Sequence, residues 1–265
     1  MNNKSLKYRL RSGQLTLGSW ITVDNEIVAE IMARQGFDWL TIDIEHSAIE
    51  FGMVQRLVRT IELNGCIPLV RVGENDANLI KRVMDTGAHG VIVPMVKTAE
   101  DARRAVSAVR YPPQGERGVG LSRAQGYGRS FDKYRQWLAK ESVVIAIIEH
   151  VDAIDNLEDI LSVEGIDATM IGPYDLSGSM GHPGEFTRKD VQAVIRRYIK
   201  TCQRLKKTAG FHVIPPNAKH LNEKIAEGFR FLALSLDSLL LSEKCRQEMA
   251  LIKGGKKRGF NKGCL

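Results

Sequence analysis

The sequence predicts an α/β fold, a single (β/α)₈ barrel, from two regularities of its apolar pattern. About eight short runs of β-branched and apolar residues recur along the chain, and some are apolar on both faces, as parallel strands buried under helices are. Longer segments with helical periodicity separate these runs. A length of 265 residues suits one such domain. An open, doubly wound sheet is the alternative, but no GxGxxG follows the first strand.

The expected strands and helices alternate along the chain. The strands lie at residues 15–22, 39–44, 67–72, 90–95, 143–148, 168–172, 210–214 and 231–236. The helices lie at residues 26–36, 51–65, 78–87, 98–110, 131–141, 155–162, 187–207, 219–228 and 238–253. Four of these helices run into a glycine that can end a helix with a positive φ, namely Gly36, Gly65, Gly87 and Gly228.

One connection breaks this rhythm. Residues 111–130 link the fourth strand to the helix before the fifth, and they hold five of the 24 glycines and two of the eight prolines. A loop of that length inside a compact barrel usually has a function, and we expect one here.

The net charge of +7 comes from the two ends of the chain. Residues 1–12, a basic N-terminal extension, carry +4, and residues 253–265, a basic C-terminal tail that we expect to be flexible, carry +5. The catalytic barrel of residues 13–252 therefore keeps −2. A basic end can bind nucleic acid or acidic lipid, but neither end has the interleaved run of aromatic residues that base stacking requires. We expect solvated ends and no nucleic-acid partner.

The cysteines indicate a reduced, cytoplasmic compartment. Cys66, Cys202, Cys245 and Cys264 show neither CxxC spacing nor histidines at zinc-site spacing. The chain shows no signal-peptide pattern and no apolar run near the ~18 residues that span a bilayer, so we expect no membrane partner.

Polar residues gather where the expected strands end, and the carboxyl ends of the strands form the active face of such a barrel. In chain order they are Asp43, Glu45 and His46 after the second strand, Arg71 at the end of the third, Glu149 after the fifth, Gly172, Pro173 and Asp175 after the sixth, and His212 within the seventh.

Glu149 and Asp175 follow neighbouring strands. Two carboxylates without a nearby cysteine suit a hard divalent cation such as Mg²⁺ or Mn²⁺. The alternative is that Asp175 caps a helix and Glu149 forms a salt bridge.

The polar cluster after the second strand indicates a catalytic base. Asp43 could orient the imidazole of His46 and leave the other ring nitrogen free to take a proton, with Glu45 on the same face as Asp43. The alternative is that these three residues cap the next helix.

Arg71 and the Gly172-Pro173 turn indicate an anion site. A guanidinium at the barrel mouth suits bidentate capture of a carboxylate or stabilisation of an enolate. The alternative for Arg71 is an ion pair with one of the neighbouring carboxylates. Gly172 and Pro173 precede a short helical stretch whose backbone amides could hold an anion.

These segments resemble the HpcH/HpaI aldolases, the metal-dependent (class II) pyruvate aldolases. The matching stretches are FDWLTIDIEHS, PLVRV, GVIVPMV, RYPPQGERGVG, IIEH and IGPYDLSGSMG, and the resemblance covers roughly residues 13–250. It implies a (β/α)₈ barrel and a homo-oligomer, a hexamer, whose last helix is exchanged between subunits. It also implies reversible cleavage of a 4-hydroxy-2-oxo acid, of the 2-keto-3-deoxy sugar acid type, to pyruvate and an aldehyde with Mg²⁺, Mn²⁺ or Co²⁺.

The resemblance implies a role for each site residue. Glu149 and Asp175 would be the metal ligands, and Arg71 would bind the keto acid and stabilise its enolate. His46 would be the catalytic base, and Asp43 would be its partner. Glu45 would be a carboxylate near metal-bound water, and the backbone of Gly172 and Pro173 would receive the pyruvate carboxylate.

Two departures from the family pattern bear on the aldehyde. His212 replaces an apolar residue, and residues 121–128 differ from the degradative members. We expect Arg123 and His212 to contact an aldehyde with polar or anionic groups.

Three other functions remain as alternatives. A CoA-thioester lyase similar to the β subunit of citrate lyase would need a site for a large anionic nucleotide, for which the sequence gives no strong signal. A Schiff-base aldolase would need a buried lysine at a strand end, and only Lys97 is near one. The third is a non-catalytic barrel that binds RNA or polysaccharide through its basic ends.

Overall fold

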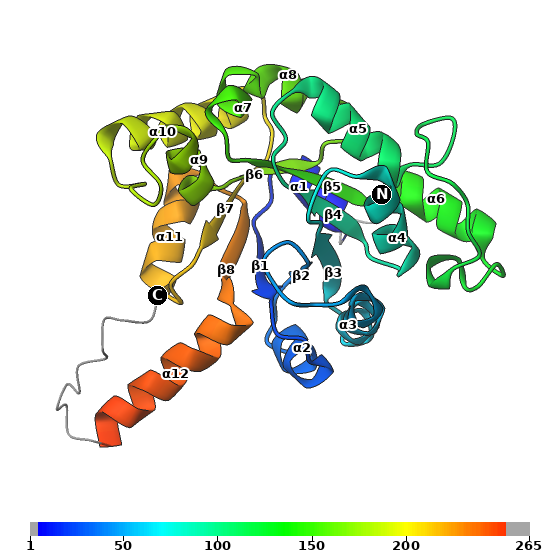
Figure 1. Ribbon diagram of the computed structural model, residues 1–265, viewed down its shortest axis with the longest axis horizontal. Coiled ribbons are helices and arrows are strands. Elements are labelled where there is room, and N and C mark those ends of the chain that lie inside the picture. Colours follow the sequence, from blue (N-terminus) through cyan, green and yellow to red (C-terminus); the bar gives the residue numbers. More distant parts are fainter. Residues whose placement is uncertain (1–4, 253–265) are drawn as a thin grey trace.

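The computed structural model describes residues 5–252, and its centre is a closed barrel of eight parallel strands in chain order (Figure 1). The strands are β1 (Thr16–Ile21), β2 (Trp39–Asp43), β3 (Ile67–Arg71), β4 (Gly90–Val93), β5 (Val143–Ile148), β6 (Ala168–Ile171), β7 (Ala209–Val213) and β8 (Phe231–Leu236). Pairing of β8 with β1 closes the barrel. The predicted fold class is confirmed, and each expected strand is present.

Helices cover the outside of the barrel (Figure 1). They are α2 (Glu26–Ala33), α3 (Phe51–Leu63), α4 (Ala77–Asp85), α5 (Ala99–Val109), α6 (Phe131–Glu141), α7 (Val151–Asp155), α8 (Leu157–Ser162), α9 (Pro173–Ser179), α10 (Lys189–Arg204), α11 (Ala218–Glu227) and α12 (Asp237–Ile252). Asn25, Asp76 and Asn217 accept N-cap hydrogen bonds, and Thr98 forms a capping box with Asp101. All four glycines expected to end helices have a positive φ.

Two apolar layers hold these elements together. One lies between the strands and the surrounding helices and contains, for example, Leu57, Ile80 and Leu161. The other fills the barrel itself with side chains such as Trp39, Ile145 and Phe231. The interior is a packed core and not a pore, and the end of the barrel where the carboxyl ends of the strands lie is called the mouth.

The N-terminal segment differs from the solvated extension that we expected. From Leu6 to Arg11 it forms α1, whose Leu6 and Leu10 are buried in the same cluster as the barrel interior. Lys7 is only 2% exposed and donates to Asp167 Oδ2 at 3.1 Å, and Arg11 Nε donates to Asp167 Oδ1 at 3.0 Å. This part of the basic end closes the amino end of the barrel. The tail at residues 253–265 lies outside the described residues.

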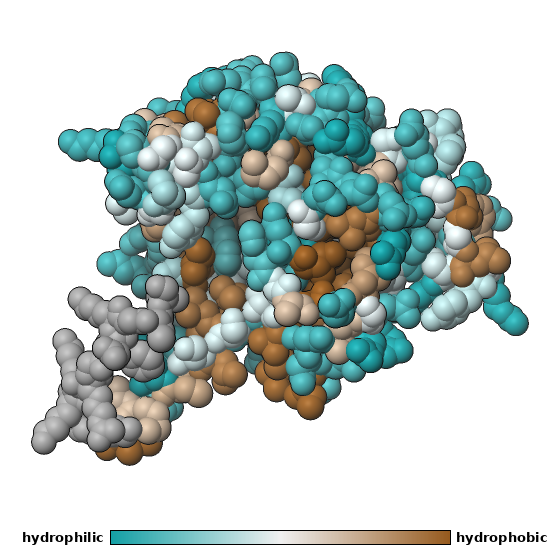
Figure 2. Space-filling model, in the orientation of Figure 1, coloured by the Kyte–Doolittle hydropathy of each residue, from teal (hydrophilic) through white to brown (hydrophobic). Residues whose placement is uncertain are grey.

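Helix α12 projects away from the barrel (Figure 1). Leu241, Met249, Leu251 and Ile252 on it are exposed, and apolar side chains are visible in this region in Figure 2. Within residues 5–252 no helix is both long and apolar enough to cross a membrane.

The ion pair between Lys7 and Asp167 gives a stability prediction. Asp167→Ala leaves Lys7 buried without its counter-charge and removes the acceptor of the Val144 amide. The free energy of unfolding should fall by about 3–5 kcal/mol, as measured by urea denaturation. Asp155→Ala, which removes an exposed partner of Arg197, is the control and should cost about 0–1 kcal/mol. Equal effects of the two substitutions would contradict the assignment.

Candidate active site

The ends of β2 and β3 bring the Asp43 carboxylate and the Arg71 guanidinium together. Asp43 lies opposite Arg71 in the strand register. Arg71 donates from Nε to Asp43 Oδ1 at 2.9 Å and from Nη2 to Asp43 Oδ2 at 2.5 Å, a bidentate geometry. Glu45 Oε2 lies 3.3 Å from Arg71 Nε. The ion-pair alternative for Arg71 is therefore correct, and its guanidinium, with a side chain 17% exposed, still lies at the mouth.

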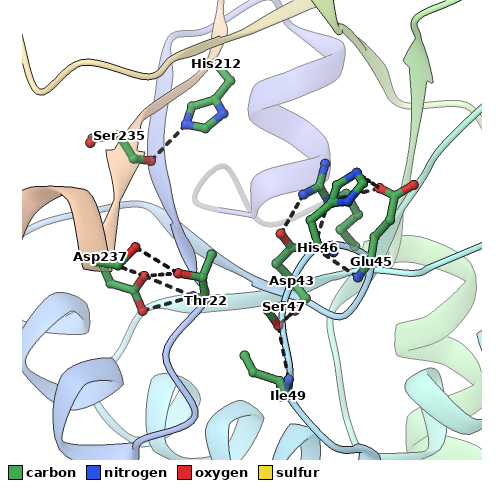
Figure 3. A network of polar contacts seen from close by, with 11 residues as sticks. Thr22, Asp43, Glu45, His46, Ser47, Ile49, His212, Ser235 and Asp237 are labelled. Atoms are coloured by element: carbon green, nitrogen blue, oxygen red, sulfur yellow. Dashed lines mark hydrogen bonds and ion pairs between the residues drawn. The ribbon is translucent and has the colours of Figure 1, made fainter. Parts of the chain in front are cut away.

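The expected pairing of Asp43 with the His46 imidazole is wrong. Besides Arg71, Asp43 Oδ1 accepts hydrogen bonds from the backbone amides of Glu45 at 3.0 Å and His46 at 3.2 Å. These four donors satisfy the carboxylate, so Asp43 holds the turn after β2 and the position of Arg71. The His46 side chain is 66% exposed and points to Glu45, with Nε2 at 3.7 Å from Glu45 Oε2 (Figure 3). Glu45 is the carboxylate beside the imidazole.

Trp20 is a site residue that the sequence analysis missed. Its ring lies under Arg71, with the guanidinium carbon 4.5 Å from the ring centroid, and its centroid is 5.5 Å from that of His212. Among the described residues its buried Nε1 has no hydrogen-bond partner. The alternation along β1, which turns Trp20 into the barrel near the strand end, was the available signal.

Glu149 is fixed by the loop after β4 and by the turn after β6. Its Oε1 accepts from the backbone amide of Met95 at 2.7 Å, and Met95 has a φ of 54°. A Cβ at Gly172 would meet Glu149 Cβ and Oε2 at 3.0 Å, which is closer than most real contacts of a Cβ. The strained Met95 backbone and the glycine therefore bring two segments close to this one carboxylate.

Gly172 and Pro173 do not have the role expected of their backbone. The Gly172 amide donates to the Ile148 carbonyl at 3.1 Å, which continues the ladder between β5 and β6, and proline has no N–H. Neither amide can receive a carboxylate. Gly172 is the N-cap of α9 and Asp175 lies in its first turn, so Asp175 is not the cap.

Three carboxylates repel one another at the mouth. The pKa of Glu149 is raised to about 7, chiefly by burial and also by the negative charges of Glu45 and Asp175, against the lowering effects of the Met95 hydrogen bond and of Arg71. Burial, Asp43 and Asp175 likewise raise the pKa of Glu45 to about 7. A bound cation would remove this repulsion, so these residues fit one.

The donor set limits how a cation would be held. Among residues 5–252 no group of three or more His, Cys, Asp or Glu side chains has the geometry to hold a metal ion. A cation on Glu149 and Asp175 would need further oxygen ligands from substrate and water, as is usual for Mg²⁺.

His212 lies at the mouth as a neutral imidazole. Its Nε2 is 3.0 Å from the carbonyl oxygen of Ser235, and a carbonyl oxygen only accepts, so Nε2 carries the proton (Figure 3). The pKa of His212 is lowered to about 4, chiefly by burial and also by the nearby Arg71 charge, against the raising effect of the hydrogen bond to Ser235. The imidazole is therefore uncharged, and its Nδ1 is a hydrogen-bond acceptor.

Arg123 does not join the site of its own chain. It donates from Nη1 to the carbonyl of Thr86 at 2.9 Å, and its Nη2 is 2.5 Å from Glu62 Oε2. Thr86 follows α4 and Glu62 is near the end of α3, so both lie at the amino end of the barrel. The long 111–130 connection therefore takes Arg123 to the opposite end from the carboxylates.

Comparison with known proteins gives consistent matches. The chain matches the family HpcH/HpaI aldolase/citrate lyase over residues 16–243. A relative from Escherichia coli K12, named 2-keto-3-deoxy-L-rhamnonate aldolase, is 39% identical over 252 residues, 94% of this chain and 93% of the relative. An HpcH/HpaI family protein from Burkholderia cenocepacia J2315 superposes with a TM-score of 0.89 at 30% identity, covering 94% of this chain and 98% of that one. An HpcH/HpaI aldolase from Desulfitobacterium hafniense gives 0.85 at 30% identity, covering 97% and 99%.

The repulsion among the carboxylates gives a second prediction. Glu149→Gln keeps an acceptor for Met95 but removes the charge, so it should raise the free energy of unfolding of the metal-free protein at pH 8 by about 1–3 kcal/mol. Because the raised pKa of Glu149 lies near 7, its ionisation destabilises the folded state increasingly from pH 4.5 to 7, and the gain should be small at pH 5.

The measurement is urea denaturation with EDTA at both pH values. Glu74→Gln, at an exposed position, is the control and should change little at either pH. A gain that is the same at pH 5 and pH 8 would contradict the prediction.

Proposed function

The chain belongs to the HpcH/HpaI aldolase/citrate lyase family and is an aldolase, and we propose that it reversibly cleaves a 2-keto-3-deoxy sugar acid to pyruvate and an aldehyde with a divalent cation. The curated relatives named 2-keto-3-deoxy-L-rhamnonate aldolase support this substrate class. The observation that carries the proposal is the group of Glu45, Glu149 and Asp175 around Arg71 at the barrel mouth.

Glu149 and Asp175 are the residues that would hold the cation, Mg²⁺, Mn²⁺ or Co²⁺. When bound, it supplies Lewis acidity that polarises the C2 carbonyl of the keto acid. The Met95 amide keeps the Glu149 carboxylate oriented toward the mouth before substrate arrives.

Arg71 binds the keto acid and stabilises negative charge as it develops on the C2 oxygen. Its Nε and Nη2 are engaged by Asp43, and the described residues leave Nη1 for the substrate. Asp43 and the Trp20 ring fix the guanidinium plane, so little reorganisation is needed when the carbon–carbon bond breaks.

His46 is positioned to move the proton of the C4 hydroxyl. Its exposed imidazole can reach a substrate directly or through one water, and the neighbouring Glu45 carboxylate stabilises the imidazolium that forms. Loss of this proton drives cleavage between C3 and C4, which releases the aldehyde and leaves the pyruvate enolate to be protonated at C3.

His212 contacts the aldehyde half of the substrate as a hydrogen-bond acceptor. Nδ1 can accept from a hydroxyl but cannot pair with a carboxylate, and Arg123 of the same chain is distant. The sugar-derived aldehyde is therefore a neutral hydroxyaldehyde and not an acidic one.

We further propose a homo-oligomer, a hexamer, in which α12 packs on a neighbouring subunit. The support is the projection of this helix from the barrel and its exposed Leu241, Leu251 and Ile252. Such a helix is unstable alone and needs a partner for its apolar side chains.

Chelation tests the reaction class. EDTA should abolish pyruvate release from a 2-keto-3-deoxy sugar acid, and Mg²⁺, Mn²⁺ or Co²⁺ should restore it. Glu149→Gln and Asp175→Asn should lower kcat by about 10²–10³-fold and not respond to added cation. The urea denaturation of Glu149→Gln checks separately that this variant is folded. Turnover that persists in EDTA would overturn the proposal.

His212→Leu tests the contact with the aldehyde half. It removes the Nδ1 acceptor, so kcat/KM for cleavage of a hydroxylated substrate should fall by about 2–13-fold, the value of one neutral hydrogen bond. Exchange of the pyruvate C3 hydrogens in D₂O, followed by NMR, involves only the pyruvate half and should be unchanged. Equal losses in both assays would show that His212 acts on the pyruvate half instead.

A further inference from the structure

We propose that the amino end of the barrel carries a second site, which binds an organic phosphate in the cavity between α1, α5 and α6. The cavity has a volume of about 650 Å³. Its charged lining residues are Lys7, Arg11, Arg110, Arg135, Lys140 and Glu164. The lining has five cations and one acid, and Asp167 and Asp132 pair with three of the cations, which leaves the cavity net positive.

The floor of the cavity is made of fixed cations. Lys7 and Arg110 are 2% and 7% exposed. Lys7 Nζ donates to the Ser142 carbonyl at 2.8 Å, and the Arg110 guanidinium donates to the carbonyls of Leu138 and Ser142. Because these bonds hold both side chains in place, their charges meet a ligand without further loss of conformational entropy.

The positive charge on this floor is not balanced inside the protein. Lys7 and Arg11 share one carboxylate, Asp167, and Arg110 has only carbonyl acceptors. The pKa of Lys7 is lowered to about 8, chiefly by burial and also by the neighbouring charges of Arg110 and Arg11, against the attraction of Asp167. A bound anion would supply the missing negative charge.

Two glycines allow segments at the cavity to lie close to α5. A Cβ at Gly115 would meet the carbonyl oxygens of Ser107 and Arg110 at 2.4 and 2.6 Å, and a Cβ at Gly165 would meet Val106 Cγ1 at 2.6 Å. The 111–115 turn, held by hydrogen bonds from Gln114 and Gly115 to the Tyr111 carbonyl, and the turn before β6 can therefore approach α5 closely.

The lining indicates the class of ligand. Lysine and arginine are the side chains that bind phosphate oxygens, and here Lys7 and Arg110 are buried while Arg135 and Lys140 are exposed. Val106, Tyr111 and Leu138 line the same cavity and offer an apolar surface for an organic moiety. The volume lies within the range of about 300–1,000 Å³ typical of small-molecule sites. A phosphate ester of nucleotide size fits the charge, the surface and the volume.

This cavity is separate from the catalytic mouth. Its residues lie on α1, the end of α5, α6 and the turn before β6, at the amino end of the barrel, and the carboxylates lie at the other end. The inference therefore does not depend on the proposed reaction. Lys7 and Arg11, which carry part of the N-terminal charge, would then bind a ligand in addition to stabilising the fold.

The test is calorimetric titration of the full-length protein with ADP at low and at physiological ionic strength. ADP should bind one to one, more weakly at the higher ionic strength. Adenosine, which has no phosphate, should not bind, and inorganic phosphate should bind more weakly than ADP.

The charge-reversing pair Arg135→Glu and Lys140→Glu, at exposed positions on α6, should weaken ADP binding at least tenfold and leave aldolase activity unchanged. Lys189→Glu with Lys200→Glu, exposed on α10, changes the net charge equally and should have less than a twofold effect. No binding at millimolar ADP, equal weakening by both pairs, or equal affinity for ADP and inorganic phosphate would overturn the proposal.

Discussion

The bidentate ion pair between Arg71 and Asp43 is the interaction on which the rest of the active face depends. It exists because β2 and β3 pair in a register that places these two residues opposite each other at the strand ends. The same carboxylate holds the turn that carries Glu45 and His46, so one side chain positions the guanidinium, the neighbouring acid and the imidazole together. A shift of one residue between the strands would turn Arg71 to the other face, and the guanidinium, the Glu45 carboxylate and the His46 imidazole would no longer lie together.

The carboxylates and the cations are separated along the barrel axis. Glu45, Glu149 and Asp175 gather at the carboxyl ends of the strands, where burial and negative charge raise the pKa values of the two glutamates. At the amino end the helices finish, and their last carbonyls are unpaired within the helix. Lys7, Arg110 and Arg123 donate to such carbonyls after α6 and α4, so positive charge accumulates there for a structural reason. The molecule is therefore electrically asymmetric although its body is nearly neutral.

The sequence predicts the fold and the residues at the mouth because both follow from local patterns. Strand runs, glycine stops and the polar residue after each strand can be recognised within a few positions. The partner of each side chain cannot be recognised in this way, because it depends on which groups lie close together in the folded chain. Asp43 binds Arg71 and two backbone amides, and His46 lies beside Glu45 instead. Arg123 lies in a 20-residue connection that is long enough to reach either end of the barrel. The charges of α1 resemble a solvated terminus until the acid that pairs with them, Asp167, is known to lie 160 residues away from Lys7.

Helix α1 has a consequence for the order in which the chain can fold during synthesis. Its six residues precede the whole barrel in the chain, yet they bind Asp38, Ser142, Asp167 and Thr208, which are spread along most of the chain. Until residue 208 has left the ribosome, the helix has only some of its partners, and the apolar side chains of Leu6 and Leu10 have no complete barrel to enter. A nascent half-barrel therefore has an open end, and a helix that precedes every strand in the chain is among the last elements to reach its final place.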